Sequence, residues 1–322
     1  MRVIFMGTPE FAVPSLAALL ESDDQVVGVV TQPDRPKGRG QELAPPPVKV
    51  LAERAGKPVI QPTKMKDPAF VDALRAWQPD VIAVAAFGRI LPPAVLSLPP
   101  KGCINVHGSL LPKYRGAAPI QWAVIHGERE TGITTMLMDE GMDTGAMLLR
   151  EVVPIREEDT SGTLAERLAT VGARLLIETL RQLKAGALHP IPQAHAQATL
   201  APLIKKEHGL IDWTLPAAAL AHRVRGFNPW PGAYTFAGAD RLTIWNATAV
   251  NEVVSAAGSV PPGTIVRAAK DGILVRTGEG FLNIVLLQQA GSRRMSVADY
   301  LAGHPLPPGL RLGPSSDGST PP

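Results

Sequence analysis

The sequence predicts an α/β protein in which a mainly parallel sheet with helices on both faces precedes a smaller antiparallel β domain. Apolar runs alternate with segments of helical periodicity up to about residue 184. The run Pro79–Phe87 is continuously apolar, which is typical of a strand buried on both faces of a parallel sheet. From Lys205 onward, short apolar segments alternate with Gly-rich turns, which is typical of a small barrel. We therefore expect a Rossmann-like domain followed by a small, OB-like β-barrel.

The first elements of the chain form a βαβ unit. Arg2–Met6 is an apolar strand, the periodic segment from Phe11 to Leu20 is a helix, and Val26–Thr31 is a second strand. Such a unit calls for a parallel pair of strands joined by a right-handed crossover. The turn at Gly7 lacks a complete G-x-G-x-x-G motif, so the sequence argues against a dinucleotide site there.

Residues 32–49 interrupt this alternation, and we expect them to form a long basic loop without secondary structure. Arg35, Lys37 and Arg39 alternate there with Pro and Gly. Loops longer than about 12 to 15 residues inside compact domains are usually functional or disordered. A basic arm suits contact with phosphates. The residues alone leave a solvated linker and a functional arm equally open.

The remaining elements divide the chain into two domains. We expect further helices at 48–55, 68–77, 117–126 and 163–184, and strands at 59–60, 79–87, 102–107, 131–138 and 146–153. Residues 1–189 form the first domain, and the uncharged residues 190–204 form a linker. Residues 205–312 form the barrel, with strands at 233–236, 242–247, 264–268, 273–277 and 281–287, and 313–322 a disordered tail. Phe227–Pro231 indicates a rigid turn with a buried Trp.

Composition narrows the classes of function. Cys103 is the only cysteine, which excludes an intramolecular disulfide and a Cys-rich metal site and suits a reducing compartment. No apolar run approaches the roughly 18 residues of a spanning helix, so we expect a cytoplasmic protein. The net charge of +3 lies in residues 205–322, which carry 11 Lys and Arg against 8 Asp and Glu. This excess permits a polyanionic partner, although a solvated basic face is the more usual explanation of so small an excess.

Asn105 and His107 form a candidate catalytic pair. They stand two apart on a predicted strand, so both side chains leave the same face just before Gly108. Asp143 follows in a Gly-flanked turn. An imidazole can take the proton that an attacking amine loses, an Asp can stabilise the imidazolium, and a carboxamide can hydrogen-bond a developing oxyanion. These residues suit acyl-level transfer to an amine, but their spacing alone favours the alternatives, which are core packing or helix capping by Asp143.

These motifs resemble a known family. Asn105-x-His107, followed by Ser109-Leu110-Leu111-Pro112 and later by Asp143-Thr144-Gly145, resembles the signature of 10-formyltetrahydrofolate-dependent formyltransferases. Three further motifs resemble the branch of that family that formylates initiator methionyl-tRNA: Thr31–Gly40, Arg115–Gln121 and Phe227–Pro231. The resemblance extends from residue 1 to about residue 312.

The resemblance implies a direct transfer in which 10-formyltetrahydrofolate is a formyl-donor cosubstrate and no metal takes part. His107 would be the general base, Asp143 its partner and Asn105 the stabiliser of the oxyanion. The folate site would be lined by Phe87, Gly88, Ile90, Leu91, Ser109, Leu110, Leu111 and Pro112. The tRNA would contact Arg35, Lys37, Arg39, Lys205 and Lys206, although for the two C-terminal lysines a solvated linker end is an equal alternative. We expect a monomer.

Two other functions remain open from the sequence. A formyltransferase acting on a nucleotide-sugar or ribonucleotide amine would need the same Asn105, His107 and Asp143. The basic loop and the complete C-terminal domain favour a tRNA acceptor over such a small amine. A tRNA-binding module with a degenerate active site is the second alternative, and it would have no need of all three residues.

Overall fold

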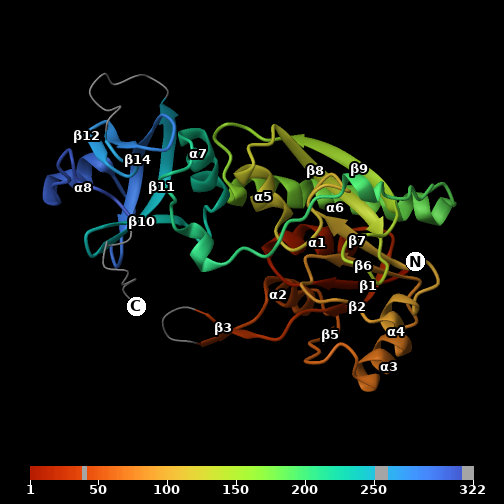
Figure 1. The fold of residues 1–322 in the computed structure, drawn as a ribbon. Coiled ribbons are helices and arrows are strands. Elements are labelled where there is room, and N and C mark those ends of the chain that lie inside the picture. The colour runs from red at the N-terminus through yellow and green to blue at the C-terminus, as the bar shows by residue number, and fades with distance from the viewer. Residues whose placement is uncertain (38–41, 251–259, 314–322) are drawn as a thin grey trace. The chain divides into compact units, whose positions relative to one another are not determined.

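The computed structural model describes residues 1–37, 42–250 and 260–313 of the chain (Figure 1). Their Cα positions group into two compact units. The first unit comprises Met1–Pro119, Glu130–Pro154 and Thr163–Pro202. The second comprises Leu203–Pro322 together with two earlier segments, Ile120–Arg129 and Ile155–Gly162. The second unit therefore includes residues from the middle of the chain as well as its C-terminal part.

A seven-stranded sheet forms the centre of the first unit, in the order β5-β2-β1-β6-β7-β8-β9. The five strands from β5 to β7 are parallel, and β8 and β9 are antiparallel to their neighbours. Their bounds are β1 Arg2–Gly7, β2 Gln25–Val30, β5 Val59–Ile60, β6 Val81–Ala85, β7 Cys103–His107, β8 Glu130–Leu137 and β9 Met147–Pro154. The predicted, mainly parallel sheet is confirmed.

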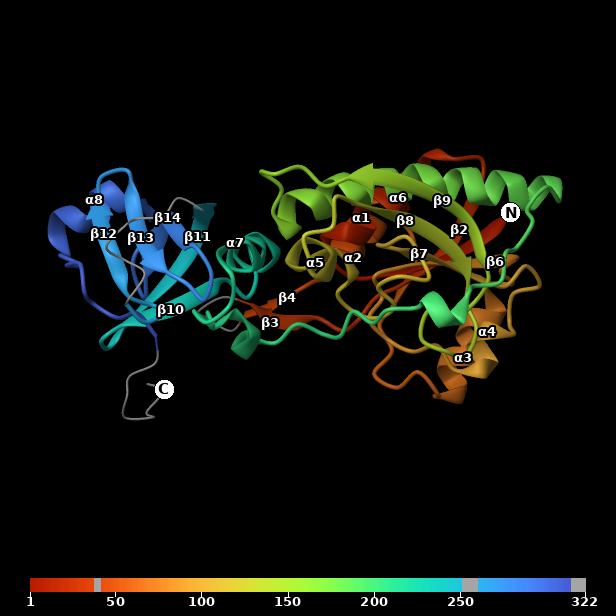
Figure 2. The same cartoon turned by 45° about the horizontal axis from the view of Figure 1, so that its top comes forward.

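Helices cover both faces of this sheet, as predicted (Figure 2). On one face, side chains of α3 and α4 join Ile4, Ile82 and Cys103 in one buried apolar cluster. On the other face, Gly172 of α6 lies against Val106 and Ile133. The helices of this unit are α1 Val13–Glu21, α2 Pro47–Arg54, α3 Pro68–Ala76, α4 Pro93–Leu96 and α6 Ser161–Ala185, with 3-10 turns at Glu10–Ala12 and His195–Gln197. The short helix α4 has no counterpart in the predicted elements.

The prediction of an unstructured loop at 32–49 is wrong in part. Arg35–Lys37 (β3) and Glu42–Ala44 (β4) pair as an antiparallel hairpin, and α2 begins at Pro47. Pro36 is unfavourable in a strand because its backbone nitrogen cannot donate a hydrogen bond to a neighbouring strand. A two-stranded hairpin tolerates it, because every strand there is an edge strand. The basic segment is thus a hairpin that projects from the C-terminal end of β2.

The second unit contains an antiparallel sheet in the order β10-β11-β14-β13-β12, with β15 beside β14. Its strands are β10 Ala233–Ala237, β11 Asp240–Val250, β12 Ile265–Ala269, β13 Gly272–Arg276, β14 Phe281–Gln289 and β15 Met295–Ser296. Its helices are α5 Pro119–Ile125, α7 Ala217–Gly226 and α8 Val297–Gly303, with a 3-10 turn at Lys206–Gly209. The five predicted strands are present, whereas α7 and α8 were not anticipated.

Barrel closure stays a prediction, because β10 and β12 do not pair directly in the observed strand order. The segment 309–313 lies between them. Leu312 N donates to Gly263 O at 2.8 Å beside β12, and Gly313 N donates to Phe236 O in β10 at 2.9 Å. The remaining tail lies outside the described residues. The expectation of a buried Trp230 is wrong: its side chain is 48% exposed, while Phe227 is the buried aromatic of that turn.

Candidate active site

Asn105 and His107 lie at the C-terminal end of β7, beside β6. Because side chains alternate along a strand, both share the sheet face of buried Cys103. Ligands of open α/β sheets bind outside the carboxyl ends of the strands. The structure therefore places the predicted pair at the sheet edge where a ligand is expected.

Two contacts orient the imidazole of His107, which is 4% exposed. Its Nε2 lies 2.9 Å from the carbonyl oxygen of Tyr114. A carbonyl only accepts hydrogen bonds, so Nε2 carries the hydrogen and the neutral ring has its lone pair on Nδ1. Nδ1 lies 3.7 Å from Asp143 Oδ2. The basic nitrogen of the ring therefore faces a carboxylate that stabilises the ring once it is protonated.

Asp143 occupies a tight turn in the left-handed region, with φ +54°. Asp139 holds this turn, since its Oδ1 accepts hydrogen bonds from Thr144 Oγ1 at 2.7 Å and from Gly141 N at 3.1 Å. The carboxylate of Asp143 accepts a hydrogen bond from Gly116 N at 2.8 Å. The turn thus presents Oδ2 to both Gly116 and His107.

The carboxamide of Asn105 is half-buried, and no hydrogen-bond partner for it occurs among the described residues. Its backbone lies between those of Val84 and Met136 in the two neighbouring strands. The amide donor of Asn105 is therefore free to bind a ligand on the sheet face that it shares with His107.

The residues that hold these loops together were not found from the sequence. Gln193, in the segment predicted to be a linker, is 5% exposed and donates to the carbonyl oxygens of Asp143 and Gly145, each at 2.8 Å. Its Oε1 accepts from Arg115 Nε at 3.0 Å and Nη2 at 2.7 Å. Residues up to Pro202 group with the first unit, so part of the expected linker packs on the site.

The residues expected to bind folate fall into two groups. The side chains of Phe87, Leu91, Ser109 and Leu111 are buried, whereas Gly88 and Ile90 are exposed and Leu110 and Pro112 are partly buried. Ile90 is 83% exposed. The first group can therefore act on a ligand through the backbone alone, while the second group offers apolar surface.

Hydrogen bonds fix the turn that contains Ser109 and Leu111. Ser109 Oγ donates to Lys113 O at 2.6 Å, so its hydroxyl proton is already used within the protein. Thr134 Oγ1 donates to Ser109 O at 2.7 Å and accepts from Leu111 N at 3.1 Å. The peptide bond between Leu111 and Pro112 is cis. These hydrogen bonds fix the conformation of the turn without a ligand.

A pocket of about 400 Å³ lies beyond the carboxyl ends of β1, β2 and β6. Arg35 of the hairpin lines it and donates to Gln32 Oε1. The other lining residues are Thr8, Pro9, Pro33, Pro36, Ala44, Pro45, Pro46, Pro47 and Ala86. One basic residue of the predicted tRNA arm thus borders a mainly apolar pocket at the sheet edge of the site.

The structure says less about whether the other expected residues contact tRNA. The backbone of Lys37 belongs to β3, and Arg39 lies outside the described residues. Lys205 and Lys206 are exposed in the second unit. Their exposure fits either alternative given above, phosphate contact or a solvated segment.

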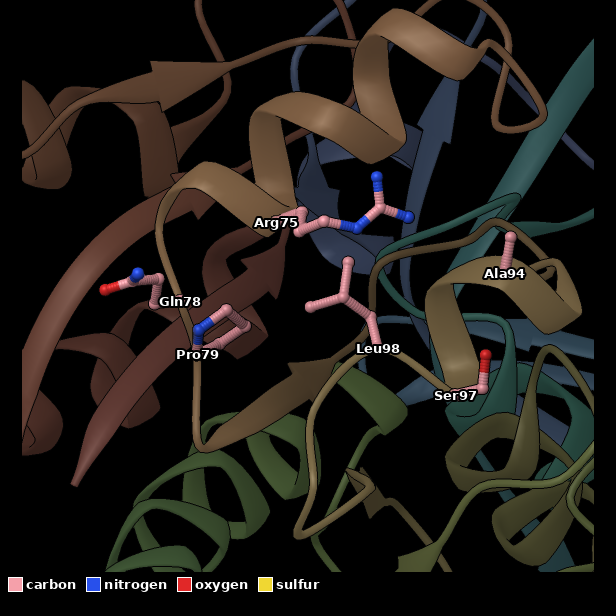
Figure 3. Close-up of a pocket in the computed structure, with 6 residues that line it drawn as sticks. All are labelled: Arg75, Gln78, Pro79, Ala94, Ser97 and Leu98. Carbon is pink, nitrogen blue, oxygen red and sulfur yellow. The ribbon is translucent and has the colours of Figure 1, made fainter.

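A second pocket, of about 440 Å³, lies away from these residues (Figure 3). Arg75, Gln78, Pro79, Ala94, Ser97 and Leu98 line it. These residues precede β6 and β7 in the chain, so the pocket lies at the amino end of those strands, opposite His107. In Figure 3 the side chains of Arg75 and Leu98 point toward each other, whereas Gln78 points away. Nothing connects this pocket with the predicted chemistry.

The described residues lack two features that would indicate other functions. None of the helices that the structure describes is long and apolar enough to cross a membrane. Among residues 1–37, 42–250 and 260–313, no three His, Cys, Asp or Glu side chains are grouped so as to hold a metal ion.

Comparisons with known proteins agree with the resemblance seen in the sequence. The formyl transferase family model matches residues 1–180, and the model of the formyl transferase C-terminal domain matches residues 203–305. A methionyl-tRNA formyltransferase of Trichlorobacter lovleyi is 53% identical over 313 residues, which is 97% of each chain. One from Caldanaerobacter subterraneus is also 53% identical, over 97% of this chain and 100% of its own. An N-formyltransferase structure from Helicobacter canadensis shares the fold, with a TM-score of 0.67 at 18% identity over 92% of this chain and 100% of its own.

Proposed function

Because this chain belongs to the formyl transferase family, we propose that it transfers the formyl group of 10-formyltetrahydrofolate to the amino group of methionine on initiator methionyl-tRNA. The product, N-formylmethionyl-tRNA, starts protein synthesis. One observation carries this assignment: the chain is 53% identical to methionyl-tRNA formyltransferases over nearly its whole length and theirs. Both the transferase domain and the C-terminal domain are covered.

His107 is the general base in this proposal. The methionine amine attacks the formyl carbon directly and must lose a proton as the new C–N bond forms. Nδ1 of His107 takes this proton, because Nε2 already donates to the carbonyl of Tyr114. The imidazolium then lies between that carbonyl and Asp143, 3.7 Å from Nδ1. Both neighbours are negative or partly negative, and this supports the assignment.

Asn105 stabilises the oxyanion that develops on the formyl oxygen. Its free amide donor supports this role, since a preorganised donor acts most strongly where it has no other partner. When the tetrahedral centre collapses, the bond between the formyl carbon and the donor folate nitrogen breaks. The imidazolium of His107 returns its proton to that nitrogen, so tetrahydrofolate leaves and the base is restored. Asp143 does not touch the formyl carbon in this scheme and acts through the charge on His107.

The folate lies at the C-terminal edge of the sheet, along the two loops after β6 and β7. Gly88, Ile90, Leu110 and Pro112 supply accessible surface for its ring system. The backbone beside Phe87, Leu91, Ser109 and Leu111 supplies polar groups, and the folding of these side chains into the core keeps that backbone in place. Ile90, which is 83% exposed, offers apolar surface to the ring system at this edge.

The basic hairpin guides the aminoacyl end of the tRNA to His107. Arg35 supports this role because it borders the pocket beside the site, and the sequence places two further cations, Lys37 and Arg39, close to it in the chain. Phosphate contacts of this type position a nucleic acid without reading its sequence. Lys205 and Lys206, exposed in the second unit, contact the tRNA backbone. In this proposal the first unit carries the chemistry and the second unit carries part of the tRNA surface.

The reaction takes place in the cytoplasm, where aminoacylated tRNA and folates meet, and the chain acts as a monomer. A monomer suffices because all the proposed catalytic groups come from a single unit. Light scattering of the purified protein tests this part of the proposal. A stable dimer would contradict it and leave the assigned reaction unchanged.

Comparison of acceptors tests the proposed function. The purified chain is supplied with 10-formyltetrahydrofolate and, in separate reactions, with methionyl-tRNA, free methionine, glycinamide ribonucleotide or a nucleotide-linked amino sugar. We expect formylation of methionyl-tRNA alone. Formylation of the amino sugar or the ribonucleotide without that of methionyl-tRNA would support the alternative acceptor class.

A further inference from the structure

The segment after α6 contributes a residue to the active-site loops. Ile191 N donates to Met147 O at 2.8 Å, and Ile191 O accepts from Met147 N at 2.9 Å, which anchors the segment at the start of β9. Thr199 O accepts from Arg115 N at 2.8 Å, and Ala201 N donates to Arg115 O at 2.7 Å. The segment is therefore fixed at both ends, and Gln193 lies between these anchors.

Gln193 uses its full hydrogen-bonding capacity within this arrangement. An amide side chain has two N–H donors and one oxygen with two lone pairs. Both donors bind carbonyl oxygens of the catalytic turn, those of Asp143 and Gly145, and both lone pairs accept from the buried guanidinium of Arg115. At 5% exposure, water cannot replace these partners. A substitution that removes the donors leaves two buried carbonyls unsatisfied.

The two loops that Gln193 joins are those that set the geometry of His107. Arg115 stands between Tyr114, whose carbonyl accepts from His107, and Gly116, whose N–H donates to Asp143. On the other side, Gln193 holds the backbone of Asp143 itself, which has a left-handed conformation that is unfavourable for a non-Gly residue. A shift of either loop changes the separation of His107 and Asp143.

We propose that Gln193 is a positioning residue for formyl transfer: it ties the Asp143 turn to the Tyr114–Gly116 loop and so sets the placement of the Asp143 carboxylate beside His107. This inference rests on the proposed function. It assigns no contact between Gln193 and either substrate. The role requires both the oxygen and the two N–H groups of the amide, which no other side chain of similar length supplies.

Two substitutions test the amide oxygen and the N–H groups of Gln193 separately. Gln193→Glu keeps an acceptor for Arg115 but turns a carboxylate oxygen toward the two carbonyls, so the Asp143 turn is released while Arg115 stays paired. Gln193→Met has similar length and no charge, and it removes all four hydrogen bonds. Gln197, exposed on the same segment, provides matched controls in Gln197→Glu and Gln197→Met. Circular dichroism and thermal unfolding verify that each variant is folded.

Formylation of methionyl-tRNA by the full chain gives kcat and KM for both substrates. We expect kcat to fall about 10- to 100-fold in both Gln193 variants, because misplacement by about 1 Å can cost 100-fold. Both KM values should stay within about 3-fold of the parent, and the Gln197 variants should match the parent. A kcat within about 2-fold of the parent in a folded Gln193→Glu variant would overturn the proposal.

A double-mutant cycle with Asp143→Asn separates positioning from a general loss of structure. If Gln193 acts through the Asp143 carboxylate, Gln193→Glu should lower kcat less than about 3-fold once that carboxylate is absent. An equal fold-loss in both backgrounds would indicate a structural role only and overturn the proposal. A parent chain without activity on methionyl-tRNA would instead overturn the proposed function and this role with it. An active parent whose Gln193 variants are equally active would overturn the positioning role alone.

Discussion

The carbonyl oxygen of Tyr114 lies 2.9 Å from Nε2 of His107, so the backbone seven residues further along the chain determines which nitrogen of the ring is basic. The hydrogen stays on Nε2, and Nδ1 faces Asp143 at 3.7 Å. The sequence suggested Asp143 as the partner of His107. In the structure, the carbonyl of Tyr114 holds the Nε2 side of the imidazole, and the Asp143 carboxylate faces its Nδ1 side.

Asn105→Asp should lower kcat by about 100- to 1,000-fold, because the change replaces a donor with a negative charge beside the developing oxyanion. The KM values should change little, since the interaction strengthens only in the transition state. Steady-state formylation of methionyl-tRNA measures both quantities. Gln197→Glu, an exposed amide-to-acid change, is the control. A raised KM with unchanged kcat would show that Asn105 binds substrate instead.

Arg35→Ala should raise KM for methionyl-tRNA and leave KM for the folate donor unchanged. If Arg35 contacts a phosphate, the slope of log affinity against log salt becomes shallower by about 0.7 to 0.9. Filter binding across a salt series provides the slope. Arg181→Ala, which removes an exposed arginine paired with Glu178 on α6, is the control. An unaltered slope with a raised KM would indicate that Arg35 shapes the pocket without neutralising a phosphate.

Gly116→Ala should destabilise the protein and reduce activity together. Gly116 has φ +118°, and a Cβ built on it would lie 2.8 Å from the carbonyl oxygen of Ala201. We expect a loss of about 1 to 3 kcal/mol in the free energy of unfolding, with displacement of the N–H that binds Asp143. Urea unfolding and kcat measure the two effects. Gly56→Ala, at φ +64° with open space around it, isolates backbone strain from collision. Equal costs at both positions would argue against the collision.

The second unit should lose stability as the pH falls below about 6.5. Burial, with a contribution from the charge of Arg225, lowers the pKa of His222 from its ordinary value of 6.5. The unfolded chain then binds more protons than the folded chain near and below that value, so acid favours unfolding. Urea midpoints at about pH 7.5 and pH 5.5 should differ more for the parent than for His222→Gln. His189→Gln, at an exposed position, should retain the parent's difference.

Much of the fold follows from short-range patterns. Continuous apolar runs predicted β1, β6 and β7, and a 3.6-residue period predicted α6, because burial on a sheet leaves a strong local signal. The hairpin of β3 and β4 was missed, since Pro36 and the surrounding glycines indicate a loop. Helices α7 and α8, which precede and follow the strands of the second unit, were missed. Their lengths of 10 and 7 residues do not account for this, since α2 and α5 have 8 and 7 residues and were predicted.

Only part of the candidate site could be predicted from the sequence. Asn105, His107 and Asp143 carry chemistry in their side chains, and a strand period places the first two together. Gln193 and the Tyr114 carbonyl were not found, because one lies 50 residues beyond Asp143 in an uncharged segment and the other is a backbone atom. No residue pattern marks such contacts. Only the positions of the loops in space reveal them.

Single-turnover transfer of labelled formyl from 10-formyltetrahydrofolate to methionyl-tRNA, by the parent and by His107→Ala, tests the central claim most directly. The parent should transfer one label per tRNA. His107→Ala should transfer the label about 100- to 10,000-fold more slowly, which is the usual contribution of a general base. Its affinity for methionyl-tRNA should equal that of the parent. Equal transfer rates for the two proteins would remove His107 from the mechanism. Failure of the parent to label methionyl-tRNA would contradict the assigned function.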